Sequence, residues 1–208
     1  MAIWKRRKAK KTFKDYKSYK PWLREDFRYA CVYCTIHEGE FGGFHSFHVE
    51  HFRPKSRFPK LETEYTNLLY ACWKCNSYKS EDWPSGYPLK SGKGYLDPCS
   101  HDYEKYFTIN SDGVVMGNVG AAKYMIENLH LNSNFLIKTR NDRKRIRESI
   151  DECKSIIKEI DSILNDEKSP TKIRSLDRIK SITISSLENR EKELTARLSP
   201  PFEPEDLR

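Results

Sequence analysis

Residues 31–34 read CVYC and residues 72–75 read CWKC, and these two pairs enclose the stretch that decides the fold, HSFHVEHFRPK at residues 45–55. Two Cys-x2-Cys pairs supply four thiolates, which match the tetrahedral, all-sulfur shell of a closed structural zinc site. We therefore predict a structural Zn²⁺ held by Cys31, Cys34, Cys72 and Cys75. The alternatives are buried unliganded thiols or disulfides, and a reducing compartment disfavours disulfides.

The stretch between the cysteine pairs predicts a β-strand. A Gly-Gly turn at residues 42–43 leads into it, and we expect it to end near His51 because Pro54 cannot donate to a strand ladder. A period of two places His48 and Glu50 on one face and His51 on the other. Local twist at the strand end would bring Glu50 and His51 toward one cavity.

The order of the following residues carries a family resemblance. The Glu-His pair is followed by NLLYAC at residues 67–72, Asn76 comes directly after the second cysteine pair, and Lys79 lies three residues further on. This order, closed by the preceding Cys-x2-Cys pair, resembles the HNH nucleases with their ββα-metal fold. The specific likeness covers about residues 31–136.

The resemblance implies hydrolysis of phosphodiester bonds. A neutral imidazole suits the activation of water near neutral pH, so His51 is the expected general base. Mg²⁺ or Mn²⁺ prefers oxygen ligands, and the resemblance assigns these to Glu50 and Asn76. It also implies that Asn67 orients the histidine and braces the loop. Two positions depart from the commonest family pattern, because Glu50 stands where Asp is usual and Asn76 where the family name implies His.

Other polar residues near this motif are candidates for supporting roles. His48, on the predicted face of Glu50, is an auxiliary candidate for the catalytic cation or for a phosphate contact. The basic residues expected to bind phosphates beside the scissile bond are Arg53, Lys55 and Lys79.

A subgroup resemblance extends the likeness beyond the motif. Residues 48–56, residues 67–72, Leu96-Asp97-Pro98 and Asp112-Gly113 are similar to HNH proteins of prokaryotic anti-phage defence. These include the HNH component of Septu-type and related retron-linked systems. In that subgroup the nuclease often works beside an ATPase of the ABC or SMC-like type, so the resemblance implies such a partner.

The positive charge of the chain is concentrated near its N-terminus. The net charge is +8, and residues 1–24 hold ten Lys or Arg against the single acid Asp15, a balance of +9. We assign residues 1–26 to a basic arm whose interleaved aromatic residues can stack on bases. The candidate nucleic-acid contacts in this arm are Lys5, Arg6 and Arg7. The alternative is a solvated arm with no specific partner.

The last third of the chain, residues 139–208, is charged and rich in Ile. The a/d seam of a continuous helix is formed by Ile146, Ile150, Cys153, Ile157, Ile160 and Leu164. After a break at residues 165–171, a looser apolar stripe consists of Leu176, Ile179, Thr183, Leu187, Leu194 and Leu198. We predict an antiparallel helical hairpin that covers the nuclease core, docks a partner protein or forms a homo-oligomer.

Taken together, these patterns predict an α+β protein with a zinc-stapled ββα-metal core at residues 27–138, an accessory β-hairpin around Asp112-Gly113 and the C-terminal helical hairpin. No apolar run is long enough to cross a bilayer, and residues 1–20 lack the apolar stretch of a signal peptide, which predicts a cytoplasmic protein. The predicted function is cleavage of DNA in anti-phage defence. The alternatives are a non-catalytic zinc module that binds nucleic acid, and an HNH-type nuclease acting on RNA.

Overall fold

The computed structural model describes residues 4–9 and 11–198 of the chain. The chain divides into two compact units, of which the second is formed by residues 140–198. Parts of two predicted regions lie outside the described residues: residues 1–3 and Lys10 of the basic N-terminal segment, and residues 199–208 after the helical hairpin.

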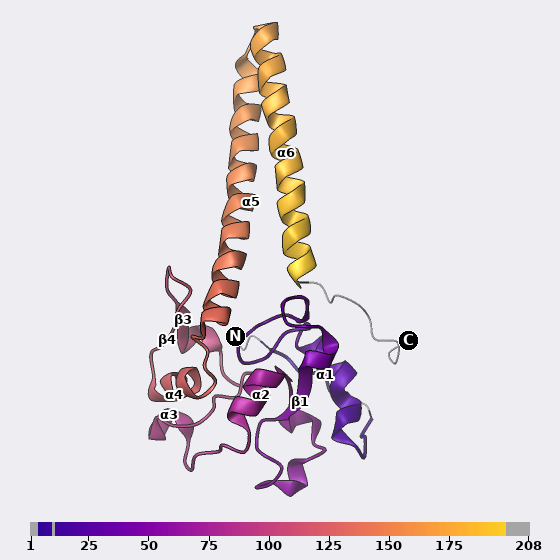
Figure 1. Cartoon of the computed structure of the whole chain (residues 1–208), viewed down its shortest axis with the longest axis vertical. Helices are drawn as coiled ribbons and strands as arrows, with labels where there is room; N and C mark the ends of the chain where they lie inside the picture. The colour runs from indigo at the N-terminus through magenta and orange to yellow at the C-terminus, as the bar shows by residue number, and fades with distance from the viewer. Residues whose placement is uncertain (1–3, 10, 199–208) are drawn as a thin grey trace. The chain divides into compact units, whose positions relative to one another are not determined.

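The centre of the first unit is a β-hairpin followed directly by a helix. Strand β1 (Phe47–His51) pairs antiparallel with β2 (Leu68–Cys72), and helix α2 (Trp73–Lys79) continues from β2 (Figure 1). Every residue of β2 is buried. The turn before β1 requires glycine, because Gly42 and Gly43 have φ angles of 77° and 73°, in the region that side chains disfavour.

Stacked rings and one buried ion pair fill the core around this hairpin. The rings of Phe47 and Tyr70 stack with their centroids 5.0 Å apart. Helix α1 (Lys20–Asp26) contributes Arg24, whose Nε and Nη2 each donate to the buried carboxylate of Glu38 at 2.9 Å. The Tyr70 hydroxyl donates to the same carboxylate. This charge is tolerated in the core because it is paired and hydrogen-bonded.

The N-terminal segment is packed into the first unit. Trp4 is buried and contacts Phe27 edge to face, with ring centroids 5.7 Å apart. Tyr19 and Leu23 are also buried in the core. Part of the segment predicted as a basic arm is therefore packed in the core, while Lys5, Lys8 and Lys11 are exposed.

Short elements complete the first unit. Strand β3 (Phe107–Ile109) pairs antiparallel with β4 (Val115–Gly117), at the place where the Asp112-Gly113 turn predicted an accessory hairpin. The remaining α-helices of this unit are α3 (Pro88–Ser91) and α4 (Gly120–Asn128). Its 3-10 helices are Tyr16–Tyr19, Glu38–Glu40, Phe44–Ser46, Pro59–Leu61, Tyr65–Asn67 and Tyr103–Lys105.

The second unit is a pair of long helices. Helix α5 (Asn134–Asp166), from Arg140 onward, runs antiparallel to α6 (Pro170–Leu198) (Figure 1). The buried residues of the predicted α5 seam are Ile146, Ile150, Cys153 and Ile160. Ion pairs join the two helices at Lys180–Asp161 and Lys154–Glu191, at 2.5 Å and 3.1 Å. Within the described residues, no helix has the length and apolar character needed to span a membrane.

The register predicted for α6 was wrong at two positions, Ile179 and Leu198, which are both exposed. Ile179 is 50% exposed, whereas the neighbouring Lys180 is half-buried and pairs with Asp161. The half-buried residues of the α6 seam follow heptad steps: Ile173, Leu176, Lys180, Thr183, Leu187 and Leu194. The ion pair explains the error at Ile179, because it lets a lysine occupy a seam position that apolar character alone assigned to its neighbour.

Candidate nuclease and metal site

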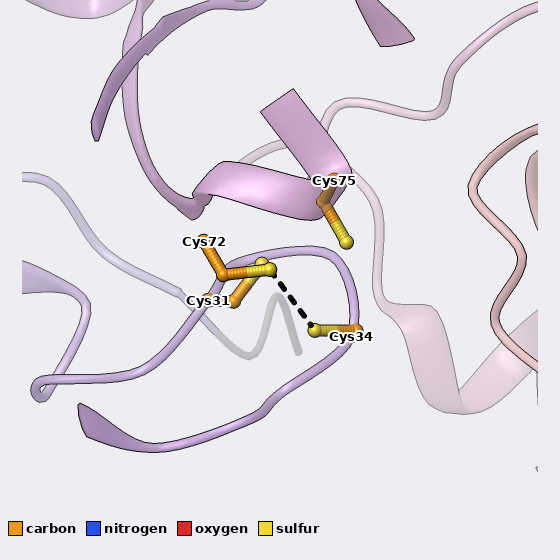
Figure 2. A group of neighbouring side chains, drawn as sticks. All are labelled: Cys31, Cys34, Cys72 and Cys75. Atoms are coloured by element: carbon orange, nitrogen blue, oxygen red, sulfur yellow. Dashed lines mark hydrogen bonds between the residues drawn. The ribbon is translucent and has the colours of Figure 1, made fainter. Parts of the chain in front are cut away.

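The four cysteines of the two Cys-x2-Cys pairs converge on one point. Cys31 and Cys34 lie in the turn that follows α1, Cys72 ends β2, and Cys75 lies in α2 (Figure 2). Their Sγ atoms all lie within 4.8 Å of one another, and all four residues are buried. Because the strand pairing and α2 position the second pair and the turn positions the first, the cluster joins segments about forty residues apart.

The geometry of the cluster fits a tetrahedral zinc ion. Zinc–sulfur bonds of about 2.3 Å in a tetrahedron place neighbouring sulfurs about 3.8 Å apart. The Sγ atoms of Cys34 and Cys72 are 3.8 Å apart. Burial raises the pKa of the Cys34 thiol, while hydrogen bonds from the other three thiols lower the pKa of Cys72. Four buried thiolates would repel one another without a cation, so the donor set calls for a metal.

Strand β1 places Glu50 in a buried ion pair. Lys79 Nζ lies 2.7 Å from Glu50 Oε1 and donates to the backbone carbonyl of His51 at 3.0 Å. The Tyr33 hydroxyl donates to the same Glu50 oxygen at 3.4 Å. Burial raises the pKa of Glu50, and the Lys79 charge opposes that rise. The carboxylate is therefore held next to the strand end that carries His51.

The ring of His51 is held in one orientation. Its Nε2 lies 2.9 Å from the backbone carbonyl of Glu62, and its face meets the ring of Tyr16 at a centroid distance of 4.6 Å. A carbonyl oxygen can only accept a hydrogen bond, so Nε2 carries the proton and Nδ1 keeps its lone pair when the ring is neutral. Burial lowers the pKa of His51, which favours this neutral form. The arrangement suits a general base.

Asn67 holds the segment of chain that directly follows His51. Its Oδ1 accepts from the backbone N–H of Arg53 at 2.9 Å, and its Nδ2 donates to the carbonyls of Arg53 and Leu61 at 3.0 Å and 3.2 Å. The backbone of Phe52 also donates to the Asn67 carbonyl. Asn67 therefore fixes the two residues that follow His51 through their backbone, which is a positioning role.

Asn76 and His48 lie in less enclosed places. Asn76 is half-buried on α2, directly after Cys75. His48 is exposed, although Glu50 on the same predicted strand face is buried. The pKa of His48 is lowered, mainly by desolvation and also by the charge of Lys20. The neighbouring charge of His48 is thus a lysine ammonium.

The six basic residues predicted to contact nucleic acid fall into two groups. Arg53, Lys55 and Lys5 are exposed. Lys79 is fully buried in its ion pair with Glu50. The prediction that Lys79 contacts a phosphate is corrected by this burial. The reason lies in the helix: Cys72, Cys75 and Lys79 follow steps of three and four, so they share the inward face.

Arg6 and Arg7 are engaged within the first unit. Arg6 Nε donates to the Leu68 carbonyl at 2.9 Å, and only 10% of its side chain is exposed. Arg7 Nε donates to Asp26 at 2.6 Å, and Arg7 Nη2 donates to Glu25 at 2.6 Å. These contacts tether the N-terminal segment to α1 and β2, and Arg7 is exposed whereas Arg6 is largely buried.

Some contributors to the site were missed by sequence reasoning. Tyr16, Glu62 and Tyr33 contact His51 or Glu50 from segments outside the motif. Glu62 acts through its backbone carbonyl, which leaves no signature in residue type. The inward role of Lys79 had a signal in its spacing from Cys75.

Comparison with known proteins agrees with this geometry. Residues 31–82 match the family model HNH endonuclease. The matched segment begins at Cys31 and ends at Asp82, so it contains the four cysteines, β1, β2 and α2. No curated protein matches the chain. The match supports nuclease activity for this segment and a requirement for divalent metal ions, which HNH nucleases use.

Proposed function

We propose that this protein is an HNH-type endonuclease that hydrolyses DNA, with His51 as its general base. The observation that carries the proposal is the contact between His51 Nε2 and the Glu62 carbonyl at 2.9 Å. It directs the unprotonated Nδ1 away from this carbonyl, as required for accepting a proton from water. Asn67 holds the backbone after His51, so the base is fixed from both sides.

The proposed ligands of the catalytic cation are Glu50 and Asn76. Among the described residues, the contacts of the Glu50 carboxylate fall on Oε1, which leaves Oε2 for a cation. One carboxylate and one amide oxygen are a donor set that suits Mg²⁺ or Mn²⁺. When bound, the cation would neutralise charge that develops on the phosphate and the leaving oxygen. His48 remains a proposed auxiliary ligand, with less support because it is exposed.

The chain's own residues would then divide the reaction between them. His51 takes the proton from the attacking water at Nδ1, and the Glu62 carbonyl stabilises the protonated ring that results. The Lys79 ammonium favours the ionised form of the buried Glu50. Arg53 and Lys55 are exposed and would bind the phosphates beside the scissile bond.

The test is cleavage of a supercoiled plasmid in Mg²⁺ and in Mn²⁺. We expect the wild type to cut and His51→Ala to lose at least about 100-fold in rate, the usual contribution of a general base. His45→Ala is the matched control, because His45 is exposed and precedes β1. Both variants should keep one zinc per chain. Equal rates for wild type and His51→Ala would refute the assignment, and matched RNA strands should be cut more slowly than DNA.

We further propose that the nuclease acts in the cytoplasm as the effector of an anti-phage system, beside an ATPase of the ABC or SMC-like type. This rests on the subgroup likeness at residues 48–56 and 67–72. The helical hairpin of the second unit offers exposed apolar residues for such a partner, including Ile163, Ile179 and Ile182. Phage-plating efficiency should rise when either the nuclease or the ATPase gene is inactivated. Unchanged protection after His51→Ala would contradict the effector role.

A further inference from the structure

Aromatic side chains gather around one lysine on the outward face of α2. Trp73, Tyr78 and Phe135 are 45%, 42% and 41% exposed. Lys74 Nζ lies 5.6–5.8 Å from the ring centroids of Phe41, Trp73 and Phe135. Phe41 stacks on Trp73 and also contacts Phe135. We call these five residues the aromatic patch.

The residues of the aromatic patch are neither ligands of the cysteine cluster nor members of the proposed nuclease site. The inward face of α2 carries Cys72, Cys75 and Lys79, whereas Trp73, Lys74 and Tyr78 point outward. Side chains of this size and apolar character are usually buried. A contiguous group of them on the surface therefore marks an interaction site. Three of the large apolar side chains exposed in the first unit fall in this one place.

Lys74 gives the aromatic patch a positive charge that can pair with an anionic group. A hollow beside it is lined by Lys74, Tyr78, His130 and Phe135 together with three cysteines of the cluster, Cys34, Cys72 and Cys75, and its lining contains no Asp or Glu. Proteins that bind single-stranded nucleic acids combine aromatic rings with positively charged groups. The rings stack on the bases, because every base has a face that can stack, and the positive groups pair with the backbone phosphates. A duplex offers no such free faces.

We propose that the aromatic patch binds single-stranded DNA, with bases stacked on Trp73 and Phe135 and a backbone phosphate paired with Lys74. The proposal rests on the proposed function and deepens it, because it names the form of substrate. Trp73 precedes Asn76 by three residues on α2, a rise of about 4.5 Å along the helix. A strand bound on the patch would therefore lie next to the proposed cation ligand.

The test measures binding without cleavage. In a His51→Ala background, fluorescence anisotropy follows a labelled single-stranded DNA and a duplex of the same sequence. We expect Trp73→Ala and Phe135→Ala each to weaken single-strand binding about tenfold, the usual loss for one stacked base. Trp73→Phe should retain most of the affinity because a ring remains. Tyr87→Ala is the matched control, since Tyr87 is 54% exposed outside the patch.

Several outcomes would overturn the proposal. Affinity within twofold of the parent for both Trp73→Ala and Phe135→Ala would do so, as would an equal loss for duplex and single strand. Tighter binding of a matched RNA strand would also contradict it. Zinc content is measured in each variant to exclude loss of the metal as the cause of weaker binding. Phe135 lies outside the cysteine pairs, so Phe135→Ala tests the patch without changing a residue between the metal ligands. Because the background is inactive, loss of binding in the patch variants supports the patch even where the plasmid assay shows no cleavage.

Discussion

The cysteine cluster lies on β2, α2 and the turn that carries Cys31 and Cys34, and the Glu50–His51 pair lies on β1, which pairs with β2, yet the two groups are held by different means. The cluster consists of four like side chains whose Sγ atoms lie within 4.8 Å of one another. Glu50 and His51 are instead each tied to a different partner, Lys79 and the Glu62 carbonyl.

This difference is the one expected between a structural metal site and the proposed reactive site. Four sulfurs would close the coordination shell of a bound zinc ion, so such a metal would only stabilise the fold. Among the residues that the structure describes, the hydrogen bonds of the Glu50 carboxylate fall on Oε1 and that of the His51 ring on Nε2, so each group retains a second atom for the proposed chemistry. A reactive site thus needs supporting hydrogen bonds that orient its side chains but leave at least one polar atom of each side chain without a protein partner.

The largest effect is expected from loss of zinc. Cys72→Ser, or removal of the metal with a chelator, should abolish the cooperative unfolding transition of the first unit. Structural zinc in small domains binds with about 10–16 kcal/mol, which equals or exceeds a typical folding free energy. Thermal unfolding and zinc content measure this. Cys99→Ser, outside the cluster, should keep its zinc. A wild type that holds no zinc would break the comparison.

The next effect comes from the buried ion pair of the reactive site. Lys79→Met leaves the Glu50 carboxylate buried without its cation and should lower the free energy of unfolding by about 3–5 kcal/mol. Denaturant unfolding measures the change. Adding Glu50→Gln to Lys79→Met should recover part of the loss, because the unpaired charge is removed.

A matched control for this variant is Lys90→Met, since Lys90 is exposed on α3 and should change stability by less than about 0.5 kcal/mol. Equal effects for Lys79→Met and Lys90→Met would mean that the ion pair contributes nothing to the fold. Lys79 would then be free to serve another role.

A smaller loss is expected at the brace after His51. Asn67→Ala removes three hydrogen bonds to backbone groups and should cost about 1–3 kcal/mol. Plasmid cleavage should fall further than this loss of stability explains, because the backbone next to His51 is released. Asn118→Ala removes one exposed bond to the Lys105 carbonyl and should leave cleavage unchanged. Normal cleavage by Asn67→Ala would show that the brace is not needed for the reaction.

The smallest effect is expected on DNA binding, and it compares the exposed Arg53 with Arg7, which is paired with two acidic residues. Arg53→Ala should weaken DNA binding and lower the slope of affinity against salt by about one charge, because Arg53 is exposed. Arg7→Ala should leave that slope unchanged, since Arg7 is held by Asp26 and Glu25. Salt titrations of DNA binding compare the two. A larger change of the salt slope for Arg7→Ala than for Arg53→Ala would show that the N-terminal segment contacts DNA.

Sequence patterns predicted the local features of the fold well. The two Cys-x2-Cys pairs identified the four residues that cluster, and the Glu-His and Cys-x2-Cys-Asn order identified the HNH segment that the family comparison also finds. The Asp112-Gly113 turn lies where β3 and β4 pair. Such features depend on spacing within short stretches, so a single sequence is enough to predict them.

Sequence patterns did not reveal burial and pairing that depend on distant segments. The basic residues near the N-terminus were treated as one group, yet Arg7 pairs with an acid on α1 and Trp4 enters the core. In α6, Ile179 was placed on the seam because it is apolar, although the charge of Asp161 on the opposite helix favours Lys180 there. A charge pattern does not reveal which charges find partners.

The sequence by itself determined the residue types and spacings of the site: four sulfurs for one metal, and the Glu-His and Asn residues for the proposed hydrolysis. Only the tertiary structure decided which atoms of these residues stay free. Lys79 was turned inward by sharing a helix face with Cys75, and His51 was oriented by a carbonyl eleven residues away. The reason is that ligand spacing is a property of the chain, whereas burial and pairing arise only when separate segments pack together.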